Sequence, residues 1–277
     1  MLNGGLYIVA TPIGNLQDIS ERAKNVLAAA DVVACEDTRV SKKLFSLLGL
    51  KIDKPFVCYE DHREEKTAQI LVQKIKDGAK VALVSDAGSP LISDPGFKLV
   101  RLCRQENLHV EVVPGASAVI CALELSGLPT NRFMFLGFVP NKTKARRDLF
   151  EEMKEVNTTL VFYETAPRLL QTLETMAEIF SGREICVVRE MTKIYEQSIN
   201  ATAAELAEYF KQNPAKGEIV VVVEPPKEQL LEINIEQELK KRLKKMSLKE
   251  AAKEVAAFSG LKKSDVYELG LRLKNEQ

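Results

Sequence analysis

The stretch that decides the fold is VALVSDAGSPLISDPG, residues 81–96, where a run of apolar residues ends abruptly in turn-forming ones. A short apolar run bounded by Gly, Pro, Ser and Asp is typical of a buried strand. Similar runs alternate with segments of helical periodicity through most of the chain. This alternation predicts an α/β fold built on largely parallel sheets.

Two breaks divide the 277 residues into three parts. Pro114-Gly115 follows the fifth predicted strand, and Pro225-Pro226 precedes a stretch whose pattern is almost purely helical. More than one domain is expected, because single cores stop growing near roughly 250 residues. The sequence predicts an N-terminal α/β domain over residues 1–118, a second α/β domain over 119–226 and a helical extension over 227–277.

The composition excludes several classes of protein. Lys plus Arg equals Asp plus Glu at 39 each, so any nucleic-acid contact must come from a local basic patch. No secretory signal is apparent and no apolar run approaches the roughly 20 residues of a membrane span. Five cysteines without a CxxC pair predict buried, reduced thiols in a cytoplasmic protein, and two histidines make a metal site unexpected.

Three turn-rich loops follow directly on predicted strands, at Pro12, at Ser85 to Gly96 and at Pro114 to Ala118. Ligands of open α/β sheets bind outside the carboxyl ends of the strands, so we expect these loops to form one pocket. Their small residues allow a ligand to approach the backbone closely. The first loop lacks the G-x-G-x-x-G pattern of dinucleotide sites, which argues against NAD and ATP.

Two further strand ends carry charged residues. Glu36, Asp37 and Arg39 follow one buried strand, and Glu164 with Arg168 follows another. Such clusters are costly unless they are paired or functional. A salt bridge from Glu36 or Asp37 to Arg39, and one from Glu164 to Arg168 across a helix turn, are the structural alternatives to a site.

Five motifs in order, VATPIGNLQDISERA, ACEDTR, VSDAGSPLISDPG, VVPGASA and TLVFYETAPRL, resemble those of the tetrapyrrole-methylase superfamily. More narrowly they resemble its branch that methylates a cytidine 2'-hydroxyl in 16S ribosomal RNA, because Ser85-Asp86-Ala87 replaces the Gly-Asp-Pro of tetrapyrrole enzymes. The resemblance implies a homodimer that binds S-adenosylmethionine between its two α/β domains. The implied cofactor contacts are Pro12, Asp86, Gly88, Ser89, Ala116, Ser117, Phe162 and Tyr163.

A ribose hydroxyl is a poor nucleophile, so a base that takes or orients its proton would help by about 10² to 10⁴-fold. Glu36 and Asp37, with Arg39 beside them, are the first candidates for this catalytic group; His62 and Glu164 are the others. Phosphates of the RNA are expected to meet a run of basic residues, for which the alternative is a solvated helix start. This run contains Lys142, Lys144, Arg146 and Arg147.

Residues 247–267 have the pattern of two helices joined by a Gly-containing turn, as in a helix-turn-helix. We expect this tail to aid docking to 16S rRNA within the small ribosomal subunit; a hairpin packed on the body or on the dimer partner is the alternative. Two other functions remain open. One is methylation of a tetrapyrrole or of the diphthamide precursor, and the other is a small-ligand sensor with a DNA-binding tail.

Overall fold

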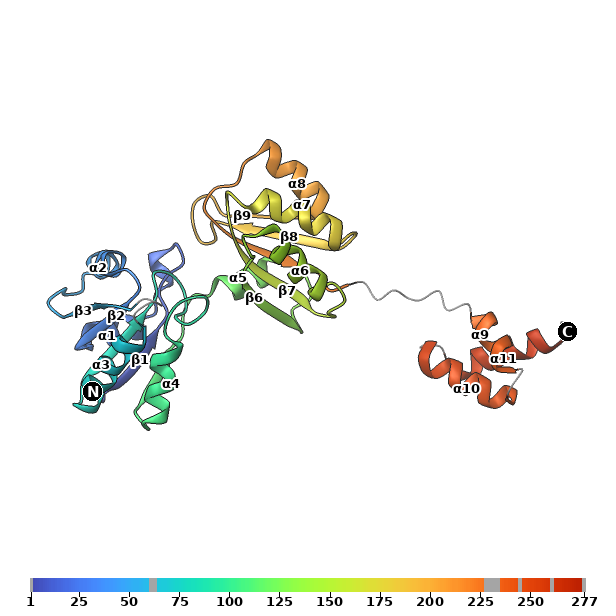
Figure 1. Cartoon of the computed structure of the whole chain (residues 1–277), viewed down its shortest axis with the longest axis horizontal. Coiled ribbons are helices and arrows are strands. Elements are labelled where there is room, and N and C mark those ends of the chain that lie inside the picture. The colour runs from blue at the N-terminus through green and yellow to red at the C-terminus, as the bar shows by residue number, and fades with distance from the viewer. Residues whose placement is uncertain (1, 60–63, 227–234, 244–245, 260–261, 276–277) are drawn as a thin grey trace. The chain divides into compact units, whose positions relative to one another are not determined.

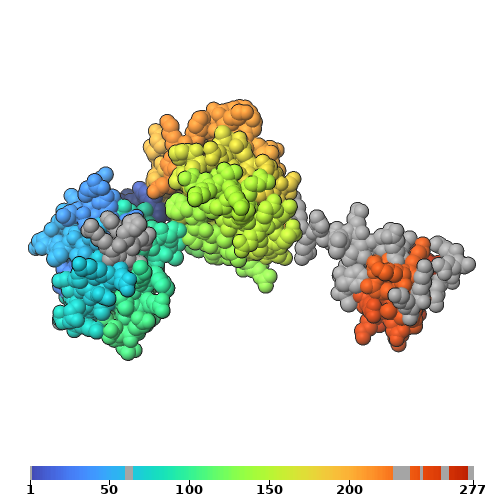
Figure 2. All heavy atoms as spheres, viewed as in Figure 1, coloured from blue at the N-terminus to red at the C-terminus, as the bar shows by residue number. Residues whose placement is uncertain are grey.

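The computed structural model describes residues 2–59, 64–226, 235–243, 246–259 and 262–275. The chain divides into two compact units, residues 1–225 and 226–277 (Figure 1). The N-terminal unit contains two five-stranded sheets, and Figure 2 shows it as two rounded lobes. The boundary predicted near residue 118 therefore separates two sheets within one compact unit.

The first sheet is parallel throughout, with strand order β3-β2-β4-β1-β5. Its strands are β1 (Gly5–Val9), β2 (Val32–Cys35), β3 (Phe56–Cys58), β4 (Lys80–Val84) and β5 (Val110–Val113). Helices α3 (Glu64–Lys76) and α4 (Phe97–Gln105) cover one face; α1 (Glu21–Ala29) and α2 (Thr38–Leu47) cover the other, after a 3-10 turn at Leu16–Asp18. Both faces are buried, which explains the apolar strands and confirms the predicted parallel α/β layer.

The second sheet has the order β6-β7-β10-β8-β9, and only its β6-β7 pair is parallel. Its strands are β6 (Phe133–Phe138), β7 (Thr159–Thr165), β8 (Glu184–Arg189), β9 (Gln197–Thr202) and β10 (Glu218–Val223). The prediction of a largely parallel sheet is wrong here. An unbroken apolar run such as that of β10 reports burial on both faces, not strand direction.

Helices enclose the second sheet from both sides. One face packs against α6 (Thr143–Met153), α7 (Leu169–Ile179) and α8 (Ala203–Gln212), while α5 (Ala118–Ser126) lies on the other. The core on the α5 side also includes Ile13, from the loop after β1. A Cβ atom at Gly14 would lie 2.6 Å from Cγ of Lys193, so the two lobes approach closely at this loop.

The cysteines are free thiols, and Cys35, Cys103 and Cys186 are buried as predicted. Burial raises the pKa of the Cys103 thiol to about 11. Cys121 is partly buried, and Cys58 is exposed, so the prediction of buried thiols is wrong for Cys58. The reason is that Cys58 ends β3, an edge strand of the first sheet.

The C-terminal unit contains the helices α9 (Ile235–Leu243), α10 (Leu248–Ser259) and α11 (Lys263–Asn275) around a core of its own. Ser247 and Glu250 cap α10 reciprocally: each side chain accepts a hydrogen bond from the other's backbone N–H, at 3.1 and 3.3 Å. Residues 260–261, which include the glycine of the predicted turn, lie outside the described residues. None of the described helices is long and apolar enough to cross a bilayer.

Candidate active site

The three predicted loops meet at one edge of the first sheet, because β4, β1 and β5 are parallel neighbours. Thr11 and Gly88 exchange two backbone hydrogen bonds, with N···O distances of 2.8 and 3.1 Å. A Cβ at Gly115 would lie 3.0 Å from Cβ of Ala10, so the third loop packs directly against the end of β1. The sequence-based prediction that these loops converge is confirmed.

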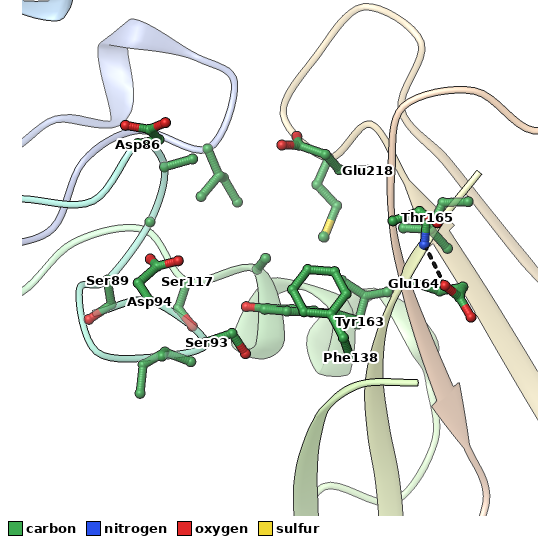
Figure 3. A pocket seen from close by; sticks show the side chains of 18 of the residues that line it. Asp86, Ser89, Ser93, Asp94, Ser117, Phe138, Tyr163, Glu164, Thr165 and Glu218 are labelled. Atoms are coloured by element: carbon green, nitrogen blue, oxygen red, sulfur yellow. Dashed lines mark hydrogen bonds between the residues drawn. The ribbon is translucent and has the colours of Figure 1, made fainter. Parts of the chain in front are cut away.

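A cavity of about 300 Å³ lies between these loops and the second sheet (Figure 3). This volume is at the lower end of the range of about 300 to 1,000 Å³ that is typical of ligand sites. Carboxylates, small residues and two aromatic rings line it. From the first lobe come Ile13, Glu36, Asp86, Ala87, Gly88, Ser89, Ile92, Ser93, Asp94, Ser117 and Ala118; from the second come Phe138, Tyr163, Glu164, Thr165, Met191, Gly217, Glu218, Ile219 and Val220.

Five of the eight predicted cofactor contacts line this cavity, namely Asp86, Gly88, Ser89, Ser117 and Tyr163. Pro12 and Ala116 do not, although their neighbours Ile13 and Ser117 do. The predicted contact through Phe162 is wrong. Phe162 is fully buried under the helices on the far face of the second sheet, because successive residues of a strand point to opposite faces.

The cavity has a negative lining. Asp86 and Asp94 approach it from the first lobe, and Glu218 lies across from them in the second (Figure 3). Burial, followed by the nearby carboxylates of Asp94 and Glu218, raises the pKa of Tyr163 to about 12. Burial also raises the pKa of Asp86, and the negative charge of Asp37 adds to the effect. The smaller contributions of Asp94, Glu218 and Asp37 to these shifts reflect carboxylates gathered around the cavity, a setting that favours a positively charged ligand.

Asp37 and Arg39 form the salt bridge that was the structural alternative. Oδ1 of Asp37 caps α2 by accepting the backbone N–H of Arg39 at 2.7 Å, and Nη2 of Arg39 donates to Oδ2 at 2.6 Å. These hydrogen bonds lower the pKa of Asp37 to about 2. The backbone N–H of Asp37 donates to Oδ1 of Asp86 at 3.1 Å, which joins the ends of β2 and β4.

Glu164 is likewise occupied by structural contacts. Its side chain is 1% exposed and accepts hydrogen bonds from the Thr172 hydroxyl at 2.5 Å and the Thr165 N–H at 2.7 Å. Nη2 of Arg168 lies 2.6 Å from its Oε1, as the structural alternative predicted. In Figure 3 the Glu164 carboxylate points away from the cavity, so it is poorly placed to act on a ligand there. His62, the remaining candidate, lies outside the described residues.

The sequence reasoning missed the contribution of the segment after β8. Met191 lines the cavity, and Nζ of Lys193 lies 2.9 Å from both Oε1 of Glu190 and Oε2 of Glu218, itself a cavity residue. Glu190 and Thr192 have φ angles of 51° and 64°, which non-glycine residues rarely adopt and which no sequence pattern signals. The usable signal was a charged segment directly after a buried strand, as at Glu36.

The predicted basic patch is reduced to three exposed residues. Lys142, Lys144 and Arg147 lie at the exposed start of α6, and Arg147 pairs with Glu178. Arg146 is only 3% exposed and donates from Nε to the Thr175 hydroxyl at 3.1 Å, so its predicted contact with RNA is wrong. It shares the inward face of the helix with Phe150, four residues later.

Two α/β lobes enclose a cavity lined by carboxylates, and the chain belongs to the tetrapyrrole (corrin/porphyrin) methylases, whose family model matches residues 5–207. It is a methyltransferase with S-adenosylmethionine as its methyl donor. A second model, the RsmI C-terminal HTH domain, matches residues 231–274. This match agrees with the helix-turn-helix pattern predicted for the tail.

Relatives of nearly equal length carry one name. The chain is 47% identical to ribosomal RNA small subunit methyltransferase I of Haemophilus influenzae, over 98% of this chain and 97% of the relative. It is 48% identical to the protein of that name from Erythrobacter litoralis, over 99% and 96%. Among solved structures it resembles diphthine synthase (TM-score 0.62, 15% identity, 79% and 89% covered) and a cobalt precorrin-4 methyltransferase (0.59, 16%, 79% and 94%). At these identities the likeness shows the fold alone.

Proposed function

We propose that this chain transfers the methyl group of S-adenosylmethionine to the 2'-hydroxyl of a cytidine in 16S rRNA, in the cytoplasm. The observation that carries this proposal is identity of 47 to 48% to ribosomal RNA small subunit methyltransferases I over almost the whole of both chains. The match includes the helical tail as well as the catalytic unit. Because these relatives are named as ribosomal RNA methyltransferases, the similarity supports RNA as the methyl acceptor of this chain.

The cavity fits S-adenosylmethionine. A sulfonium cation is favoured by facing carboxylates, and the rings of Phe138 and Tyr163 add apolar walls. Gly88 has a φ of 78°, which favours glycine, and a Cβ atom there would lie 3.3 Å from Cγ2 of Ile13. A larger residue at position 88 would therefore crowd the cavity. Asp86, Gly88, Ser89, Ser117 and Tyr163 would hold the cofactor, which supplies an electrophilic methyl group.

The protein's own contribution is to position the acceptor and to handle its proton. A carboxylate that takes or orients the proton of the ribose hydroxyl must lie at the cavity and remain basic. Asp37 does not meet the second condition, because Arg39 lowers its pKa to about 2. Glu36 lines the cavity at the end of β2, so we propose Glu36 as the catalytic base.

RNA binding would use the basic start of α6 and the helical tail. Lys142 and Lys144 are exposed only a few residues after Phe138, which lines the cavity. Phosphate contacts of this kind fix the orientation of an RNA without reading its sequence. The match of the tail to a helix-turn-helix model is consistent with a second point of attachment on the small ribosomal subunit.

A second copy of the chain would cover exposed apolar residues of the second lobe. Phe133 and Met134 lie exposed on β6, an edge strand, and Ile120 and Leu125 lie exposed on α5. Unprotected edges with apolar side chains are sites of association. These residues support a homodimer, which sedimentation of the full chain at several concentrations tests.

The test of the proposed function is methylation itself. Purified protein is incubated with radiolabelled S-adenosylmethionine and small ribosomal subunits from cells that lack this modification. We expect label in 16S rRNA at one cytidine ribose, located by resistance of the adjacent bond to alkaline hydrolysis. Label that enters a porphyrin or a protein instead would overturn the RNA assignment and leave the methyltransferase assignment intact.

A further inference from the structure

A second, more open cavity of about 500 Å³ adjoins the first. It lies between the end of β2, the start of α2, the end of β3 and the loop after β4, and is lined by Glu36, Asp37, Thr38, Arg39, Cys58 and Asp86. Glu36 and Asp86 line both cavities. The two spaces therefore share a wall of two carboxylates.

The sizes of the cavities determine which ligand each can take. At about 300 Å³ the first cavity lies at the lower end of the range of ligand sites, so a bound cofactor would take up most of it. Methyl transfer nevertheless requires the acceptor oxygen to lie about 3 to 3.5 Å from the methyl carbon. The acceptor must therefore enter through a space that shares a wall with the first cavity, as the second cavity does.

The charged residues that line the second cavity determine which groups of a nucleotide can bind there. Three carboxylates, Glu36, Asp37 and Asp86, outnumber the single guanidinium of Arg39, so the interior accepts hydrogen-bond donors and repels anions. Ribose hydroxyls and the N4 amino group of cytosine are donors, whereas uracil has an acceptor oxygen at that position. This lining favours cytidine over uridine.

Arg39 is suited to the one anionic part of a nucleotide. Its side chain is 89% exposed, and its Nε and Nη2 donate to Asp37. Nη1 makes no hydrogen bond to any residue that the structure describes. The salt bridge to Asp37 thus holds the guanidinium in place while one edge still faces outward, which is the geometry that a phosphate contact needs.

We propose that the second cavity is the acceptor subsite, in which Glu36 and Asp86 receive the donor groups of the target cytidine and Arg39 binds a flanking phosphate at the rim. This inference rests on the proposed function. It assigns to Asp86 a second contact, on the acceptor side of the shared wall, and it makes Arg39 a substrate-binding residue.

The exposed thiol of Cys58 provides a direct probe, since Cys58 lines the second cavity and not the first. The full chain is alkylated with iodoacetamide, and modification of each cysteine is followed by mass spectrometry. We expect S-adenosylhomocysteine alone to leave the rate at Cys58 unchanged. A short oligoribonucleotide that contains the target cytidine should slow it at least threefold, and the same oligonucleotide with uridine should not. Cys121, which is partly buried on α5, is the internal control.

Variants separate this subsite from general RNA binding. Arg39→Ala should raise KM for RNA about tenfold with little change in kcat or in cofactor affinity, and Arg39→Lys should recover part of the loss. In Asp86→Asn the ratio of affinities for cytidine and uridine oligonucleotides should fall about tenfold, because an amide can donate to the uracil oxygen. This ratio is independent of any loss of cofactor affinity.

Two results would overturn the proposal in distinguishable ways. If RNA is methylated at a cytidine while Cys58 reacts at an unchanged rate and Asp86→Asn keeps its preference for cytidine, the subsite is wrong and the proposed function stands. If RNA is neither bound nor methylated under any condition, the proposed function fails, and the subsite fails with it.

Discussion

Two segments at strand ends carry nearly the same charged residues, but the fold uses them differently. Glu36 to Arg39 follows β2 and Glu164 to Arg168 follows β7, and each contains an acidic residue that pairs with an arginine. In the first segment Asp37 pairs with the exposed Arg39, and Glu36 lies at the cavity wall. In the second the Glu164 carboxylate is buried and fully engaged. In these two segments, burial rather than residue type distinguishes the acidic residue at the cavity wall from the one held in a structural salt bridge.

The largest expected effect is on catalysis. Glu36→Gln keeps the size of the side chain but removes the base, so kcat should fall by about 10² to 10⁴-fold. Cofactor affinity, measured by calorimetry, should change little. Asp37→Asn is the matched control from the same segment: kcat should be largely retained, although the weaker hold on Arg39 should raise KM for RNA. Equal turnover by Glu36→Gln and the unmodified enzyme would place the base elsewhere.

The next largest effect is on stability, in the second segment. Glu164→Ala should lower the free energy of unfolding by about 2 to 4 kcal/mol, because it leaves the Thr172 hydroxyl and part of the Arg168 guanidinium without their partner. Glu164→Gln keeps an acceptor for Thr172 and should lose less. Urea unfolding followed by circular dichroism measures the difference. A loss of the same size in Glu36→Ala would contradict the contrast between the two segments.

A smaller effect is expected on the pH dependence of cofactor binding. Burial raises the pKa of Asp86 above its ordinary value of 3.8, and a cationic ligand favours the ionised form. Affinity for S-adenosylmethionine should therefore increase as the pH rises through that raised pKa, by about tenfold, and then level off. Titration calorimetry between pH 4 and pH 8, values that bracket an acidic carboxyl, would detect it. Asp86→Asn should flatten the curve.

The smallest effect concerns the exposed pair. Since Arg39 lowers the pKa of Asp37 from 3.8 to about 2, the pair stabilises the fold above pH 3.8, and this contribution is lost as the pH falls to about 2. Asp37→Asn should be slightly less stable than the unmodified chain at neutral pH and equal to it near pH 2. The measurement is the urea midpoint at both values. A difference that persists in acid would show that the Asp37 cap contributes without its charge.

Much of the first lobe could be predicted from the sequence, because its strands have clear apolar runs and the residues that follow them lie at one edge of a parallel sheet. Each loop of the site follows an apolar strand of a parallel sheet, so Asp86, Gly88 and Ser117 could be assigned to one edge. The polar strand β9 has no apolar run, and it was not predicted. Strand direction in the second sheet could not be predicted from the sequence either, because a strand buried on both faces has the same apolar pattern whether it runs parallel or antiparallel to its neighbours.

Single-residue assignments failed where orientation decides the role. Phe162 and Tyr163 are adjacent, and only the placement of the sheet determines which of them faces the cavity. Arg146 and Arg147 are adjacent as well, and the packed face of α6 determines which one is buried. A periodic pattern indicates that alternate residues differ, but it does not say which set points to a particular cavity.

By itself the sequence determined the α/β class, the helical tail and the loops that meet at the first sheet, because strand signals and turn residues are local. Only the tertiary structure decided that Asp37 pairs with Arg39 and that Glu164 pairs with Arg168 and Thr172. It also decided that Glu36 lines the cavity. These outcomes depend on distances between segments that are far apart in the chain. These distances set the burial of each charged side chain, and burial decides whether the side chain is held in a structural pair or remains accessible to a ligand.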